Sequence, residues 1–166
     1  MSEDTERDER RAALLARLDA LEDRMTVLES PTVPVVDPEQ RDVTARTLWG
    51  EARGEGQRGM EAVAAVIMNR VRDPRRWPNT PAEVSQQPWQ FSCWNANDPN
   101  LPQLMRVTDS DPQFRLALNI AERAITGILT DPTHGANHFH THAVNPSWSR
   151  GVTPIAIIGN HRFFRL

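Results

Sequence analysis

The sequence has little of three features that would each point to a particular class of protein. One cysteine, Cys93, among 166 residues excludes an internal disulfide and a zinc site built from several thiolates. No apolar run approaches the roughly 18 residues that a membrane-spanning helix needs. The N-terminal residues carry acids and arginines where a signal peptide has an apolar centre. We therefore expect no membrane insertion, and synthesis in the cytoplasm without a signal peptide.

The chain also has a small formal net charge, -3 at pH 7. This balance argues against nucleic acid as the partner. A local basic cluster does occur, at Arg70, Arg72, Arg75 and Arg76. We interpret it as the solvated end of a helix, because cations are favoured near a helix C-terminus. The apolar content of 39% is typical of a folded globular domain.

Residues 1–29 form the first expected unit, an amphipathic helix. Its apolar residues recur at alternating spacings of four and three, as in a heptad repeat: Leu14, Leu18, Leu21, Met25 and Leu28. A lone helix of this length is marginal in water, so the apolar seam predicts a coiled coil formed by self-association or with a partner. Packing on the chain's own domain is the alternative. The proline-rich residues 30–41 are expected to be an extended linker.

The second expected unit is a domain over residues 42–166. Its first helix should begin with Asp42 or Thr44 as N-cap and stop at Gly54. Further helices are expected over 57–72, from Thr80-Pro81, and from Asp111-Pro112 to about Leu129. The segments HFHTHAV and IAIIGNHRFFRL near the C-terminus are typical of short strands. The fold class is therefore α+β, mainly α with a small β component.

The segment WGEARGEG places two glutamates, Glu51 and Glu55, against the apolar run AVAAVIMNRV. Glu51 falls in the last turn of the first expected helix of the domain. A helix C-terminus carries partial negative charge, which favours the protonated form of an acid placed there. A protonated carboxyl group in a partly apolar cleft can act as a general acid on a glycosidic oxygen. The alternative is that both glutamates are solvated surface residues.

Four blocks in order carry a family resemblance: ARTLWGEARGEGQRGMEAVAAVIMNRVRDPRRWPNT, QFSCWN, GANHFHTHAVNPSW and IGNHRFF. Over about residues 43–166 the chain resembles the catalytic domain of the cell wall hydrolase family that includes the spore cortex-lytic enzymes. The resemblance implies a lysozyme-like, α-rich fold related to the lytic transglycosylases and the resuscitation-promoting factors. It implies cleavage of the β-1,4 bond between N-acetylmuramic acid and N-acetylglucosamine in peptidoglycan, with Glu51 as the catalytic acid and no cofactor.

A two-carboxylate glycosidase needs its acids on opposite sides of the scissile bond, about 5 Å apart if retaining and about 6.5 to 9.5 Å if inverting. Glu55 follows Glu51 too closely in the chain to lie opposite it. Asp98 and Asp109 fall in loops, so the sequence offers no obvious second acid. We therefore favour a lytic transglycosylase, in which one acid protonates the leaving oxygen and the muramyl 6-hydroxyl then closes a 1,6-anhydro ring. Hydrolysis is the alternative outcome.

Glu55 is expected to contact substrate or to hold the loop by accepting a hydrogen bond from Arg53 or Asn69. Gly50 and Gly54 lack a Cβ and should let a sugar chain or a neighbouring segment approach the helix end. Aromatic and amide side chains suit sugar binding, because flat apolar rings and hydrogen-bonding groups match the two kinds of sugar surface. Core packing explains Trp94 equally well. The candidate substrate-binding residues are Glu55, Gln90, Ser92, Trp94, Asn137, His138, His140 and Trp148.

The histidines raise the alternative of a zinc-dependent peptidase or amidase. His138, His140 and His142 would project from one face of a strand, and His134 and His161 could approach them. An acidic ligand at matching spacing is missing, so we expect no metal.

A third alternative is a non-catalytic glycan-binding module of a phage-like particle, assembled through the N-terminal helix. A wall substrate combined with the absence of a signal peptide indicates an endolysin released through a holin, or a component of such a particle.

Overall fold

The computed structural model describes residues 3–27 and 35–166, and the side chains of residues 5–22 and 35–166. It divides into two compact units, Met1–Val35 and Val36–Leu166. Within the described residues, every helix is too short or too polar to cross a membrane.

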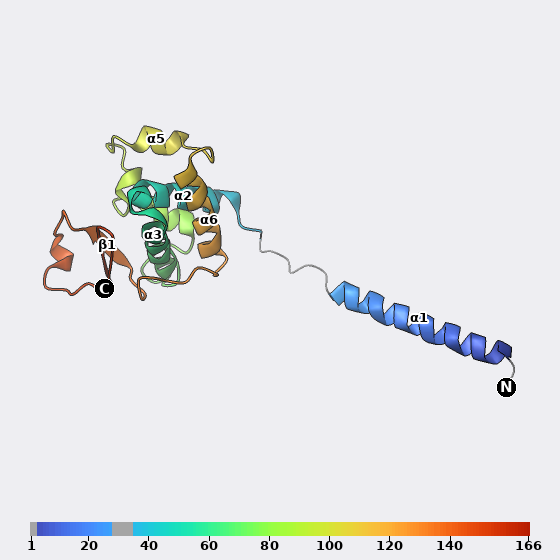
Figure 1. The fold of residues 1–166 in the computed structure, drawn as a ribbon. Helices are drawn as coiled ribbons and strands as arrows, with labels where there is room; N and C mark the ends of the chain where they lie inside the picture. The colour runs from blue at the N-terminus through green and yellow to red at the C-terminus, as the bar shows by residue number, and fades with distance from the viewer. Residues whose placement is uncertain (1–2, 28–34) are drawn as a thin grey trace. The chain divides into compact units, whose positions relative to one another are not determined.

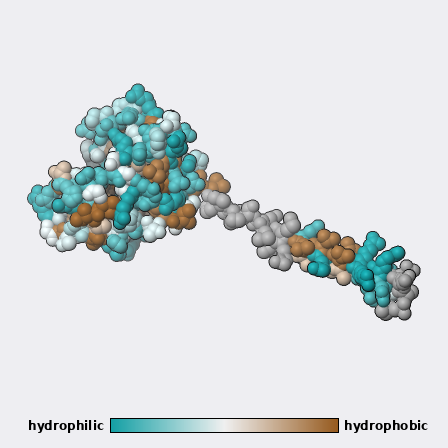
Figure 2. All heavy atoms as spheres, in the orientation of Figure 1, coloured by the Kyte–Doolittle hydropathy of each residue, from teal (hydrophilic) through white to brown (hydrophobic). Residues whose placement is uncertain are grey.

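The first unit contains a single described helix, α1, from Glu3 to Val27 (Figure 1). Its leucines face solvent, with Leu14 at 62%, Leu18 at 51% and Leu21 at 53% exposure. Figure 2 shows these apolar side chains gathered along the described part of α1. The other two positions of the predicted seam, the side chain of Met25 and the whole of Leu28, lie outside the described residues. The predicted helix is thus present, and its association stays a prediction.

The second unit is mainly helical, with one small sheet (Figure 1), as the sequence predicted. Its α-helices are α2 (Pro38–Ala52), α3 (Gly56–Val71), α4 (Pro81–Gln86), α5 (Leu101–Arg106) and α6 (Pro112–Ile125). Three short 3₁₀ turns are η1 (Arg53–Glu55), η2 (Ser92–Trp94) and η3 (Ser147–Ser149). The strands are β1 (His138–Thr141), β2 (Ala156–Ile158) and β3 (His161–Phe164).

Helices α2, α4 and α6 each begin at a capping side chain followed by proline. The Thr80 hydroxyl accepts from the Glu83 N–H at the start of α4, and the Asp111 carboxylate accepts from two amides at the start of α6. Both starts were predicted. The predicted start of α2 at Asp42 or Thr44 is wrong, because Asp37 caps this helix and Pro38 is its first residue. The helix thus begins inside the segment predicted as linker, and the domain limits themselves stay a prediction.

The helix ends differ more from expectation. The chain after α2 continues through η1, and the glycine with a left-handed backbone is Gly56, at φ 67°, rather than Gly54. Helix α3 ends at Val71, within one residue of its predicted end. Helix α6 ends at Ile125, earlier than the predicted Leu129, and a left-handed glycine follows it.

The main core lies between α2, α3 and α6, with side chains from α4, η2 and α5 closing it. Its largest fully buried members include Leu48, Trp49, Met60, Phe91 and Ile120. Burying one large apolar side chain of this kind contributes about 1.5–3 kcal/mol. A second, smaller cluster joins the sheet to another face of α3 through Ala62, Val66, Ala136, Ile158 and Phe163. Helix α3 is therefore shared by both clusters and supports the end of α2.

The sheet is antiparallel in the order β1-β3-β2. Its register places Thr141 opposite His161 and His138 opposite Phe164. The final strand, β3, therefore lies in the centre of the sheet, with β1 on one side and β2 on the other. The turn between β2 and β3 thus joins two neighbouring strands.

Arg70 does not belong to a solvated basic cluster. It is 3% exposed, its guanidinium lies 4.2 Å from the ring centre of Trp77, and its Nε donates to the Asn137 carbonyl at 2.8 Å. Burial lowers the pKa of Arg70 to about 10. The solvated interpretation is wrong here, because the arginine joins α3 to the segment leading into β1. Arg75 and Arg76 are exposed.

Candidate active site

Glu51 lies in the last turn of α2, as predicted. Its Oε1 accepts a hydrogen bond from the Cys93 backbone N–H at 3.0 Å and another from the Ser92 hydroxyl at 3.3 Å. Among the described residues, its Oε2 has no hydrogen-bond donor. A protonated Glu51 would therefore carry its proton on Oε2, because Oε1 acts as the acceptor.

Gly50 explains how the η2 turn reaches Glu51. A Cβ built on Gly50 would lie 2.6 Å from the Cβ of Cys93 and 3.2 Å from a Leu104 methyl group, so only glycine lets η2 and α5 pack this closely. The predicted close approach is confirmed here. It is wrong for a neighbouring segment at Gly54, where the described structure leaves open space within 4 Å. Burial, followed by the charge of Glu51, raises the pKa of the Cys93 thiol, so the cysteine stays neutral.

A cavity of about 250 Å³ opens in front of Glu51. It is lined by Trp49, Gly50, Glu51, Arg53, Ser92, Cys93, Asp98, Asn100, Leu104, Thr141 and His161. The walls come from α2, η1, η2, α5 and the facing strands β1 and β3. Arg53 caps the end of α2, because its guanidinium donates to the Trp49 and Gly50 carbonyls and lies 4.2 Å from the Trp49 ring centre.

Thr141 and His161 are cavity residues that the sequence did not identify as such. They face each other across β1 and β3, which brings both to the cavity together. Burial lowers the pKa of His161, against the opposing effect of the charges on Glu55 and Glu51. The ring is therefore neutral at pH 7. Its Nδ1 is buried and has no hydrogen-bond partner among the described residues. The signal for His161 was its place in the IGNHRFF block.

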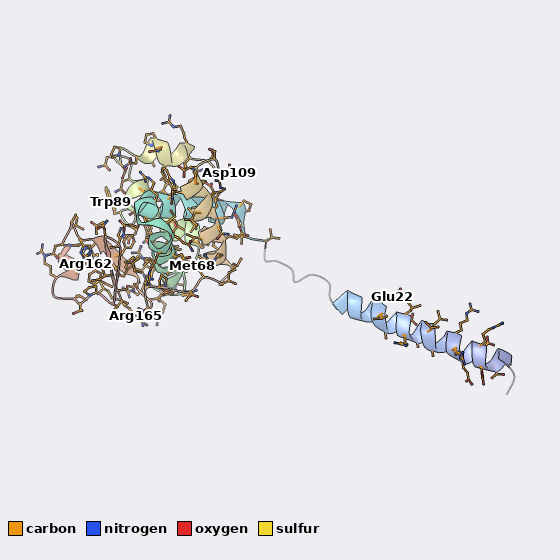
Figure 3. All side chains as sticks on the ribbon, viewed as in Figure 1. Glu22, Met68, Trp89, Asp109, Arg162 and Arg165 are labelled. Carbon is orange, nitrogen blue, oxygen red and sulfur yellow. The ribbon has the colours of Figure 1, made fainter. Side chains whose placement is uncertain are left out.

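Asp98 also lines this cavity, so one of the two loop aspartates that the sequence could not place lies near Glu51. Its carboxylate accepts a hydrogen bond from the Asn100 N–H at 2.7 Å. Asp109 does not line the cavity and comes from the loop between α5 and α6 (Figure 3). Asp98 is thus the one of the two loop aspartates that can influence chemistry at Glu51.

Glu55 has different surroundings. Its Oε2 accepts from the Asn160 backbone N–H at 2.9 Å, and its Oε1 accepts from the Asn160 side-chain amide at 2.8 Å. These hydrogen bonds lower the pKa of Glu55. The predicted donors are wrong, because Arg53 caps α2 and Asn69 donates to Asp131 and the Ala136 carbonyl. The expected role in holding a loop fits these contacts, and Glu55 is absent from the lining of the Glu51 cavity.

Two glycines make room for the Glu55 side chain. A Cβ on Gly159 would lie 1.9 Å from the Glu55 Oε2, and a Cβ on Gly59 would lie 2.3 Å from the Glu55 Cβ. Gly159 also has a left-handed backbone, at φ 56°. Glu55 therefore joins the turn after α2 to the turn between β2 and β3. This second turn leads directly into His161.

Residues of the QFSCWN block line two different cavities. Ser92 lines the Glu51 cavity, whereas Trp94 lines a second depression of about 420 Å³ with Gln86, Pro88, Trp89, Asn95, Ala96 and Asn97. The Trp94 indole N–H donates to the Thr47 hydroxyl at 2.8 Å, and the ring packs partly on the main core. Gln90 is half-buried and lines neither cavity.

The third block supplies Thr141 to the Glu51 cavity, and its aromatic side chains form a cluster that lines neither cavity. Trp148 contacts His138, His140 and Phe164, with ring centres 5.0–5.4 Å apart across the cluster. Burial, together with the charges of Arg70 and Arg76, lowers the pKa of His138 to about 4. Substrate contact by His138, His140 and Trp148 stays a prediction.

Asn137 is tied to the C-terminal residue, since its amide donates to the Leu166 carbonyl at 2.8 Å and accepts from the Leu166 N–H at 3.0 Å. Its substrate contact also stays a prediction.

His138 and His140 of β1 both contact the Trp148 ring, and His140 also stacks on Phe164. His142, which follows β1, instead accepts from the Arg162 guanidinium at 2.9 Å. Over residues 3–27 and 35–166, no group of three or more His, Cys, Asp or Glu side chains is arranged to hold a metal ion.

Known proteins are similar to this chain in sequence and in fold. The family model described as Cell Wall Hydrolase matches residues 54–164, beginning shortly after Glu51. The spore cortex-lytic enzyme of Halalkalibacterium halodurans is 29% identical over 87% of this chain and 41% of its own length. That of Bacillus subtilis is 31% identical over 72% of this chain and 35% of its own length. The chain thus spans about two fifths or less of these relatives.

Two solved structures share the fold. The catalytic domain of the germination-specific lytic transglycosylase SleB from Bacillus anthracis has a TM-score of 0.62 and 28% identity, over 78% of this chain and 97% of that chain. The catalytic domain of the Bacillus cereus SleB protein has a TM-score of 0.59 and 25% identity, over 81% of this chain and 98% of that chain. These matches agree with the lysozyme-like fold that the resemblance implied. The chain therefore belongs to the cell wall hydrolase family.

Proposed function

We propose that this chain degrades peptidoglycan by cleaving the β-1,4 bond between N-acetylmuramic acid and N-acetylglucosamine, with Glu51 as general acid. The observation that carries the proposal is the position of Glu51 at the end of α2, in a cavity, where the described residues form hydrogen bonds to its Oε1 and leave Oε2 without one. Similarity to the catalytic domain of a lytic transglycosylase supports the same activity.

Glu51 would act twice in this reaction. Its Oε2 first donates a proton to the glycosidic oxygen, while the Cys93 N–H and the Ser92 hydroxyl hold Oε1 and fix the orientation of the carboxyl group. The resulting carboxylate then removes the proton from the muramyl 6-hydroxyl, whose oxygen attacks the anomeric carbon and closes the 1,6-anhydro ring. No water enters the product. His161 is neutral and therefore does not compete as a proton donor near pH 7.

Hydrolysis is the second candidate, and the place of Asp98 in the same cavity favours it. In that reaction Asp98 would remove a proton from a water molecule as Glu51 protonates the leaving oxygen. We favour the anhydro reaction, because the chain is similar to the catalytic domain of a lytic transglycosylase.

The proposal is tested by incubating purified peptidoglycan with the full chain and with a Glu51→Gln variant. We expect soluble fragments from the first and none from the second, and mass spectrometry should place every new end at the muramic acid. EDTA should leave the release unchanged. New peptide ends, or release that EDTA abolishes, would contradict the proposal and favour a zinc-dependent peptidase. Retained wall binding without fragments would favour a non-catalytic binding module.

The proposal also covers what the enzyme associates with and where it acts. The exposed leucines of α1 support self-association or docking to a protein of a phage-like particle. Action on the wall after holin-type release, or from within such a particle, stays a prediction.

A further inference from the structure

A second depression of about 420 Å³ lies beside the segment that binds Glu51. Its volume falls within the roughly 300–1,000 Å³ of sites that bind small molecules. Residues 92–100 separate the two places, since Ser92 and Asp98 line the Glu51 cavity while Trp94 and Asn97 line the depression. The Trp94 indole also bonds to Thr47, one helical turn before Glu51 on α2. The depression is therefore attached to the catalytic helix.

Trp89 is the unusual residue of this depression. Its side chain is 83% exposed, and its backbone is left-handed at φ 67°. That conformation is disfavoured for a bulky side chain, and residues held in it cluster at sites that bind ligands. Figure 3 shows Trp89 in the loop that follows α4. An exposed indole does not contribute to the core, so the fold itself does not account for it.

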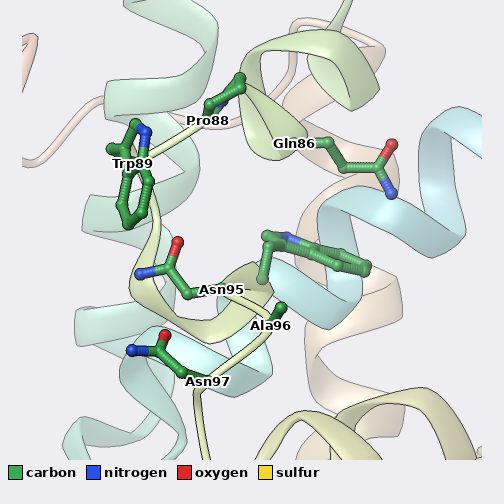
Figure 4. Close-up of a pocket in the computed structure, with 7 residues that line it drawn as sticks. Gln86, Pro88, Trp89, Asn95, Ala96 and Asn97 are labelled. Atoms are coloured by element: carbon green, nitrogen blue, oxygen red, sulfur yellow. The ribbon is translucent and has the colours of Figure 1, made fainter.

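The polar groups of the depression are amides. In Figure 4 the indole of Trp89 and the amides of Asn95 and Asn97 follow one another along one side, and Gln86 comes from the other side. In the part of the chain that the structure describes, no hydrogen bond engages these three side-chain amides. None of the seven lining residues is charged. The surface suits a neutral ligand with both apolar faces and hydrogen-bonding groups.

We propose that this depression is a glycan subsite, in which an N-acetylated sugar of the strand stacks on Trp89 and bonds to the amides of Asn95 and Asn97. The inference rests on the proposed function, because it extends the bound glycan beyond the bond at Glu51. A peptide stem fits less well, since its carboxylates would meet no cation here. The site binds sugar without taking part in proton transfer.

The test measures binding in the full chain carrying Glu51→Gln, which prevents cleavage. An N-acetylglucosamine tetramer is titrated in and followed by NMR of backbone and side-chain amides. We expect the Trp89 indole signal and the Asn95 and Asn97 amide signals to shift. Adding Trp89→Ala should weaken binding about tenfold, which corresponds to about 1.4 kcal/mol.

Two variants serve as controls. Ile128→Ala removes another apolar side chain, 71% exposed and outside the depression, and should leave the affinity unchanged. Trp89→Phe keeps a ring and should retain most of the binding. In the active chain, Trp89→Ala should raise KM for soluble glycan strands and leave kcat within about twofold. Thermal unfolding should not change, because the side chain is not packed.

Equal affinity in Trp89→Ala and Ile128→Ala, or shifts confined to residues around Glu51, would overturn the subsite. Binding of a peptide-carrying disaccharide without binding of the tetramer would overturn it as well, in favour of a stem site. Fragment release by the unaltered chain reports separately on the proposed function. The cleavage reaction can therefore be confirmed while the subsite is refuted. The subsite can likewise be confirmed if the chain binds glycan without cleaving it.

Discussion

The last turn of α2 and the η1 turn that follows it each carry one glutamate, and the two have very different surroundings. Glu51 lines a cavity and uses one oxygen to accept hydrogen bonds from η2. Glu55 uses both oxygens to accept from Asn160 and lies between Gly59 and Gly159. The same residue type therefore serves two purposes within one short segment. A carboxyl group with a free oxygen can move a proton, whereas one with both oxygens engaged connects two turns.

The largest expected effect comes from Glu51→Gln. The amide is nearly isosteric and cannot donate the acid proton, so the rate of fragment release should fall about 100-fold to 10,000-fold. The matched variant Glu55→Gln should stay within about tenfold of the unaltered chain. Initial rates of release from purified peptidoglycan measure both. A near-normal rate for Glu51→Gln together with a large loss for Glu55→Gln would reverse the two roles.

Gly159→Ala should weaken the connection between the two turns. The added Cβ would meet the Glu55 carboxylate, and its backbone is left-handed. Such strain costs on the order of 1–3 kcal/mol, so we expect a clearly lower midpoint of urea unfolding. Gly54→Ala is the control, since the described structure leaves open space there. Equal midpoints for the two variants would mean that Glu55 does not fix the β2–β3 turn.

Glu55 should also make stability depend on pH. Hydrogen bonds from Asn160 lower its pKa below the ordinary value of 4.5. Its contribution is therefore present above the unfolded pKa and is lost as pH falls through the folded pKa. The difference in unfolding free energy between the unaltered chain and Glu55→Gln should thus be larger at pH 6 than at pH 3. A difference that stays constant over this range would contradict the assignment.

The smallest effect on cleavage is expected from removing α1. The second unit has its own core, so a chain that starts at Val36 should cleave at the same rate. The full chain should self-associate through the exposed leucines of α1, and the shortened one should be monomeric. Sedimentation at tens of micromolar measures this. A monomeric full chain would leave α1 as a site for another protein.

Local signals predicted much of the fold. Thr80-Pro81 and Asp111-Pro112 marked the starts of α4 and α6, because a capping side chain followed by proline is a property of a few neighbouring residues. Asp37-Pro38 has the same pattern at the start of α2. It follows other prolines, so it was predicted to be part of the linker and not a helix start. Helix α5, only six residues long, gave no periodic pattern to detect.

The site was less accessible to sequence reasoning. The place of Glu51 follows from the helix that carries it, together with the family resemblance. Thr141 and His161 reach the cavity through the pairing of β1 with β3, and Asp98 reaches it from the loop between η2 and α5. Asn160 as the partner of Glu55 depends on the same long-range arrangement. Such contacts join residues distant in the chain, so no local pattern reveals them.

The most direct test of a reaction driven by Glu51 alone is cleavage in water enriched in heavy oxygen, followed by mass spectrometry of the fragments. The account predicts muramyl ends with a 1,6-anhydro ring and no label, and Asp98→Asn should reduce the rate less than tenfold. One labelled oxygen at every cut, with a loss in Asp98→Asn close to that in Glu51→Gln, would contradict it.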